Sequence, residues 1–121
     1  MNPNRQRIGL GRRGEELAVQ ALRRRGYEIV ERNWRCPVGE ADIIARRGQE
    51  WAFVEVRTRR GEAFGTPEES ITPQKRARMQ AVAERYIAEQ GLWEADGHLL
   101  MVAVEMDRAG RLQRVEVLEM D

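Results

Sequence analysis

The sequence predicts an α/β fold, in which one domain contains a mixed β-sheet flanked by helices, with the element order α-β-β-β-α-β-β. Two stretches repeat apolar residues at helical spacing, and five shorter stretches are strand-like. The first helical stretch precedes three of the strand-like stretches, and the second precedes the other two. A length of 121 residues suits one domain of ordinary size. We therefore expect a single domain over residues 1–121, with residues 1–9 as a flexible N-terminal tail.

The first helix is expected over residues 11–25, followed by three strands. Its apolar face consists of Leu17, Ala18, Ala21 and Leu22. Gly26 follows, and glycine is common just after a helix C-terminus. Strands are then expected over residues 27–34, 40–46 and 50–58, and their connections are Cys36-Pro37-Val38-Gly39 and Arg47-Gly48-Gln49.

A loop, a second helix and two further strands complete the pattern. Residues 59–70 contain two glycines and a proline, so we expect a mobile loop there. Thr72 before Pro73 is typical of a helix N-cap with proline in the first turn. Gly91 should end this helix near residue 90. The last strands are expected over residues 98–106 and 112–120, joined by a turn at 107–110.

The composition indicates where the protein is expected in the cell more clearly than what it does. The single cysteine, Cys36, cannot form an internal disulfide, which favours a reducing cytoplasm. We expect no signal peptide at the N-terminus and no membrane partner, because the longest apolar run, residues 99–104, is too short to span a bilayer. Residues 1–35 hold nine arginines against four glutamates. This basic half is compatible with a polyanionic partner, and equally with a solvated surface of mixed charge.

Two carboxylates on neighbouring strands are the candidate functional residues. Alternation places Asp42 on one face of its strand with Glu40 and Ile44, and it places Glu55 in an apolar strand, Trp51-Ala52-Phe53-Val54-Glu55-Val56-Arg57. A lone buried carboxylate needs a cation, a proton or a metal beside it. Asp42, Glu55 and the Val56 carbonyl would form an oxygen site for Mg²⁺ or Mn²⁺. The alternative is an ion pair between Glu55 and Arg57 or another arginine.

Several sequence pieces together resemble a known family. They are Gly11-x-x-Gly14-Glu15-x-x-Ala18, Gly26-Tyr27, Arg32-Asn33-Trp34-Arg35, Gly39-Glu40-x-Asp42-Ile43-Ile44, Phe53-Val54-Glu55-Val56-Arg57-x-Arg59 and Thr72-x-x-Lys75. In this order they resemble the YraN-like family of bacterial proteins, whose function is largely uncharacterised. The acid pattern also resembles the restriction-endonuclease-like nuclease superfamily, whose signature is an acid, a variable gap and acid-x-lysine. The element order is similar to that of archaeal Holliday-junction resolvases.

The resemblance implies a restriction-endonuclease-like fold and roles for four residues. Asp42 and Glu55 would be metal ligands, and Glu15 on the first helix would assist metal or water binding. Arg57 stands where the superfamily usually has lysine. Arginine stays protonated, so it is a poor general base, but it can bind phosphate. Leu100 stands where related chains often carry an aspartate.

The resemblance implies phosphodiester hydrolysis on DNA rather than RNA, with branched DNA among the substrates, and a homodimer. Lys75 lies in the first turn of the second helix, where free N–H groups and the helix dipole favour phosphate. With Arg59 and Arg76 it would form a rim that binds the nucleic-acid backbone. Two alternatives remain: a DNA- or RNA-binding adaptor with weak or lost catalysis, and a purely structural protein-interaction module.

Overall fold

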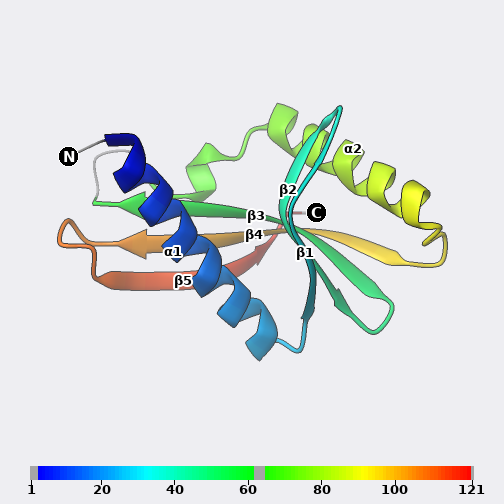
Figure 1. The fold of residues 1–121 in the computed structure, drawn as a ribbon, viewed down its shortest axis with the longest axis horizontal. Coiled ribbons are helices and arrows are strands. Elements are labelled where there is room, and N and C mark those ends of the chain that lie inside the picture. The colour runs from blue at the N-terminus through cyan, green and yellow to red at the C-terminus, as the bar shows by residue number, and fades with distance from the viewer. Residues whose placement is uncertain (1–2, 62–64, 121) are drawn as a thin grey trace.

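One five-stranded mixed sheet lies between two helices (Figure 1). The computed structural model describes residues 3–61 and 65–120, with side chains described from residue 11 onward. The elements are α1 (Pro3–Arg24), β1 (Glu28–Cys36), β2 (Gly39–Arg47), β3 (Glu50–Arg60), the 3₁₀ helix η1 (Glu68–Ser70), α2 (Pro73–Gln90), β4 (Asp96–Met106) and β5 (Leu112–Glu119). The expected order of helices and strands is confirmed, with η1 added before α2.

The strands lie in the order β1-β2-β3-β4-β5. The pairs β1–β2, β2–β3 and β4–β5 are antiparallel, whereas β3 and β4 are parallel. Parallel neighbours cannot be joined by a tight turn, so the chain crosses over from β3 to β4 through α2. This crossover places α2 on the opposite face of the sheet from α1 (Figure 1).

Each face of the sheet carries its own apolar core. The core beneath α1 contains the buried residues Ala18, Val19, Leu22, Tyr27, Ile43, Ala45, Ala52, Val54, Leu100, Val102, Val104 and Met106. The core beneath α2 contains Ala41, Ile44, Trp51, Phe53, Met79, Val82, Ala83, Tyr86, Leu99, Met101, Ala103 and Met120. Strands β3 and β4 contribute alternate residues to both cores, as expected for strands covered on both faces.

The ends of α2 follow the local sequence signals. The Thr72 side chain caps the helix by accepting a 3.1 Å hydrogen bond from the Lys75 backbone N–H. At the other end Gly91 adopts the left-handed conformation, with φ of 66°. Neither helix in the described part of the chain is long and apolar enough to cross a membrane.

Two expected boundaries were wrong. Helix α1 begins at Pro3 rather than near Gly11, so residues 3–9 of the expected tail belong to a helix. Arginine and glutamine are good helix formers, and proline is tolerated in a first turn. Strand β3 continues to Arg60, because it pairs with β4 through that residue, so the expected loop at 59–70 begins only at Gly61. The expectation that this loop is mobile falls partly on residues 62–64, outside the described residues.

The alternation of faces breaks in β1 beside the point where the pairing of β2 with β3 ends. Arg32 lies opposite Ile43, on the α1 side, whereas Trp34 lies opposite Ala41, on the α2 side. Asn33, between them, has φ of 54° and is the only non-glycine residue with positive φ in the described part of the chain. Asparagine tolerates this conformation better than most residues. This break lies in β1 beside Asp42, which lines a cleft with the α2 residues Lys75 and Met79, on the side of the sheet where Ile44 is buried.

A glycine brings α1 close to the sheet beside this break. Gly14 is buried, and a Cβ atom added there would collide with the Thr58 hydroxyl and lie 3.2 Å from the Thr58 Cβ. Gly11, one turn earlier in the same helix, has open space around the corresponding position. Only Gly14 is therefore required for the close approach of α1 to β3, which also positions Glu15.

This difference predicts opposite effects of one substitution at the two glycines. Gly14→Ala should lower the free energy of unfolding by about 1–3 kcal/mol, because the added methyl overpacks the helix–sheet contact. Gly11→Ala should raise it by up to about 1 kcal/mol, because alanine favours the helix. Urea unfolding measures both, and Thr58→Ala should recover part of the Gly14→Ala loss. Equal stability of the two glycine variants would contradict the close approach.

Candidate functional site

The site forms where β2 separates from β3. The ladder between these strands ends at the pair Ile43 and Val54, one step before Asp42 and Glu55 would face each other. Instead, the Asp42 carboxylate accepts a 2.8 Å hydrogen bond from the Val56 N–H. The N–H and carbonyl of one strand residue point to the same edge. The Val56 carbonyl is therefore on the same side as the Asp42 carboxylate.

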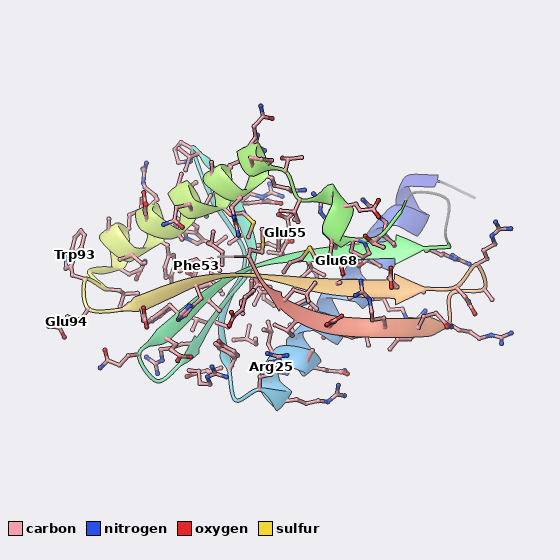
Figure 2. All side chains as sticks on the ribbon, turned by 180° about the vertical axis from the view of Figure 1, so that it is seen from behind. Arg25, Phe53, Glu55, Glu68, Trp93 and Glu94 are labelled. Carbon is pink, nitrogen blue, oxygen red and sulfur yellow. The ribbon has the colours of Figure 1, made fainter. Side chains whose placement is uncertain are left out.

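A cleft of about 670 Å³ opens at this separation. Its walls come from the β1–β2 hairpin, β3 and the first turns of α2. The lining residues are Arg35, Cys36, Gly39, Glu40, Asp42, Glu55, Val56, Arg57, Lys75, Arg78 and Met79. Figure 2 shows Glu55 near the middle of the molecule beside α2, far from the surface turn that carries Trp93 and Glu94. The cleft thus gathers the two expected carboxylates, the Val56 backbone and two of the expected cations.

Asp42 is a strongly perturbed carboxyl group. Loss of solvent contact raises its pKa to about 6 from an ordinary value of 3.8, although the hydrogen bond from Val56 N–H acts in the opposite direction. The negative charges of Glu55, Glu15 and Glu40 raise this pKa further. Asp42 is therefore a desolvated acid with three other carboxylates around it, an arrangement typical of functional sites.

Glu55 is held by two cations. Burial raises the pKa of Glu55 above its ordinary value, and the charges of Arg57 and Arg78 act in the opposite direction. Its carboxylate lies 3.1 Å from the Arg57 guanidinium and 3.1 Å from the Lys75 ammonium. The expected ion pair between Glu55 and Arg57 is confirmed. The second partner is the only lysine in the chain.

The donor set fits a hard divalent cation with few protein ligands. Within the described residues, no three Asp, Glu, His or Cys side chains are arranged to hold a metal ion. Mg²⁺, however, typically binds through one or two carboxylates and keeps several water ligands. Asp42 and Glu55, with the Val56 carbonyl, provide such a set, and a cation between them would offset the burial of the Asp42 charge and its repulsion from the neighbouring carboxylates.

Glu15 acts on the site from the other face of the sheet. It does not line the cleft, and its carboxylate lies 3.6 Å from the Arg32 guanidinium. Its charge nevertheless raises the pKa of Asp42. The Asp42 carboxylate therefore interacts with a charge on the α1 side of the sheet as well as with the charges of the cleft. Leu100, where the sequence resemblance implied an aspartate in related chains, is buried beneath α1 and contributes no charge to the cleft.

The four expected cations separate into two groups. Arg57 and Lys75 line the cleft, whereas Arg59 lies one same-face position further along β3. Arg76 borders a different, largely apolar groove of about 1000 Å³ between α2 and β4–β5. Lys75 and Arg76 border different hollows because adjacent residues on a helix point in directions about 100° apart.

The cleft also contains residues that were not among the expected site residues, of which Arg78 is the clearest. Arg78 follows Lys75 by three residues, a spacing that places both on one helix face. This spacing could have indicated from the sequence that Arg78 lies on the same side of α2 as Lys75. Gly39 was also overlooked, and a Cβ atom there would lie 3.1 Å from Arg78 Cγ and from Val82 Cγ2. Glycine at this position allows the hairpin to pack closely against α2.

The raised pKa of Asp42 predicts how stability changes with pH. Because the pKa is about 6 in the folded protein and 3.8 ordinarily, protonated Asp42 favours folding. This contribution is complete below about pH 4 and is lost as pH rises through about 6, which costs up to about 3 kcal/mol. Asp42→Asn keeps an oxygen for the Val56 N–H and removes the charge. Near pH 8, Asp42→Asn should unfold at higher urea concentration than the parent protein, and near pH 4 the two should converge. Lower stability of Asp42→Asn near pH 8 would show that the charge is favourable there.

Comparison with known proteins supports membership of one family. The family model described as "Uncharacterised protein family UPF0102" matches residues 14–119. A UPF0102 protein of Moorella thermoacetica is 45% identical over 109 residues, which are 90% of this chain and 91% of the relative. A UPF0102 protein of Beutenbergia cavernae is 45% identical over 114 residues, covering 94% and 96% of the two chains. One from Nocardia farcinica is 57% identical over 86 residues, covering 70% and 68%. The chain therefore belongs to the uncharacterised protein family UPF0102.

Proposed function

We propose that this protein is a metal-dependent nuclease with a restriction-endonuclease-like fold that hydrolyses phosphodiester bonds in DNA. The observation that carries the proposal is the pair of desolvated carboxylates, Asp42 and Glu55, brought together where two strands part. A simple ion pair accounts for Glu55, but no described cation pairs with Asp42. The preference for DNA over RNA follows the sequence resemblance to nucleases and resolvases.

Asp42, Glu55 and the Val56 carbonyl would hold Mg²⁺ or Mn²⁺. A metal bound there would activate water and stabilise negative charge on the phosphodiester. The Val56 N–H fixes the Asp42 carboxylate before any substrate arrives. Glu15 would support the site through its charge, which adds to the negative potential at Asp42.

Lys75 and Arg57 are the groups positioned to bind the phosphate. Both contact Glu55, and both are more than half buried, so their charges are poorly screened by water. Lys75 supplies a compact cation, which Arg57 on β3 cannot. It also lies in the first turn of α2, where the helix dipole favours an anion. The lysine of the acid-x-lysine signature is thus functionally replaced by one from a helix.

A second function is favoured by the same two ion pairs. If Arg57 and Lys75 stay on Glu55, the carboxylate is already neutralised and needs no metal. Below about pH 6, protonation would neutralise Asp42 as well. The protein would then bind nucleic acid through its arginines as a catalytically weak adaptor. Divalent-metal binding separates the two functions, because the adaptor does not require it.

The proposed nuclease predicts Mn²⁺-dependent cleavage of single-stranded, duplex or branched DNA. Asp42→Asn and Glu55→Gln should reduce cleavage to background, because each removes one negatively charged ligand with little change in shape. Lys75→Ala should lower kcat by about 100-fold, the typical cost of losing one group that stabilises transition-state charge. Gel-based cleavage assays with added Mn²⁺ or EDTA measure all three.

Arg24→Ala is the matched control, because it removes an exposed arginine at the end of α1 that contributes nothing to the cleft. Its cleavage rate should equal that of the parent protein. Undiminished cleavage by Asp42→Asn and Glu55→Gln would eliminate the assigned site. Salt-sensitive DNA binding with neither cleavage nor metal binding would favour the adaptor.

A further inference from the structure

Two arginines continue the line of the site along β3. Glu55, Arg57 and Arg59 occupy alternate positions of the strand, so their side chains share the face that Phe53 presents to α2. Successive members of this row are roughly 6.6 Å apart along the strand. That interval is close to the separation of neighbouring phosphates along one nucleic-acid strand. We call Arg57 and Arg59 the arginine row.

The arginine row carries hydrogen-bond donors that the protein does not use. The Nε groups of Arg57 and Arg59 are buried and have no hydrogen-bond partner among the described residues. A buried donor without an acceptor costs free energy, so such groups call for an explanation. Arg57 at least has Glu55 as an ion partner. Arg59 has no ion pair or side-chain hydrogen bond within the described part of the chain.

The acid beside Arg59 in the sheet is already engaged by another cation. Arg59 lies beside Glu105 in the β3–β4 register. The Glu105 carboxylate lies 2.8 Å from Arg114 on β5, and Arg114 also pairs with Glu68 and Glu116. The Nε of Arg114 also makes no well-aligned hydrogen bond, but it lies 2.8 Å from the Glu105 carboxylate, and Glu68 and Glu116 contact the same guanidinium. Among the described residues, no carboxylate therefore compensates the charge of Arg59.

We infer that the arginine row is a phosphate track, in which Arg59 binds the phosphodiester next to the one cleaved at Asp42 and Glu55. The inference rests on the proposed function only for the statement that the neighbouring phosphodiester is the one cleaved. The binding of nucleic acid by Arg59 itself requires no catalysis. The ligand is two successive phosphates of one nucleic-acid strand, contacted without reading the bases. That strand can be unpaired or part of a duplex.

The inference is tested by binding in EDTA, where no cleavage occurs. Fluorescence anisotropy of a labelled oligothymidylate and of a duplex of equal length gives Kd between about 50 and 200 mM salt. Arg59→Ala and Arg59→Gln should weaken binding several-fold. They should also reduce the slope of log Kd against log salt by about 0.7 on the single strand, or about 0.9 on the duplex. Arg59→Lys should retain most of the slope.

Arg24→Ala removes the same charge elsewhere and should leave both Kd and the slope unchanged. Equal effects of Arg59→Ala and Arg24→Ala, with both variants folded by circular dichroism, would overturn the track. If Arg59→Ala weakens binding to the single strand alone, the track binds an unpaired strand. If it weakens binding to both probes, the track binds either form.

Failure of this inference is distinguishable from failure of the proposed nuclease. If no metal-dependent cleavage is found but Arg59→Ala still lowers the salt slope, the track stands and hydrolysis fails. If cleavage is found, Arg59→Ala should raise KM and leave kcat nearly unchanged, because it removes binding made equally by substrate and transition state. A large loss of kcat with unchanged KM would contradict the role of Arg59 as a binding residue.

Discussion

The hydrogen bond from the Val56 N–H to the Asp42 carboxylate is the interaction on which the site depends. It occupies the point where the β2–β3 ladder ends, so a side chain replaces a backbone carbonyl. The backbone donor remains satisfied although the two strands separate. The separation in turn opens the cleft and turns the Val56 carbonyl toward it. Without an acceptor at this position, the gap would leave a buried N–H unpaired, at a cost of about 1–3 kcal/mol.

This arrangement sets stability against function. Asp42 is desolvated and lies near three other acids, so its charged form destabilises the fold at neutral pH. The two apolar cores on either face of the sheet stabilise the fold despite that cost. The charge of Glu55, in contrast to that of Asp42, is compensated directly by Arg57 and Lys75. A bound cation would relieve the repulsion at Asp42 and would release these two side chains for a phosphate.

The local features of the fold could be predicted from sequence, and those that depend on tertiary pairing could not. Thr72 and Gly91 define the ends of α2 through contacts within a few residues, so the residue types at these two positions are enough to predict where the helix begins and ends. The carboxylate pair was also predictable, because alternation and a tight turn bring Asp42 and Glu55 together. The left-handed Asn33, which breaks the alternation of faces in β1, has no signal in the strand pattern. The contact between Lys75 and Glu55 depends on where α2 packs on the sheet, which local spacing does not determine.

The most direct measurement is a crystal structure of the protein soaked with Mn²⁺ at about pH 8, above the Asp42 pKa. The account predicts an anomalous scattering peak between the Asp42 and Glu55 carboxylates and the Val56 carbonyl, with Lys75 no longer in contact with Glu55. No peak there, with Glu55 still paired with both Arg57 and Lys75, would contradict it and would leave the acids as parts of a structural ion-pair network.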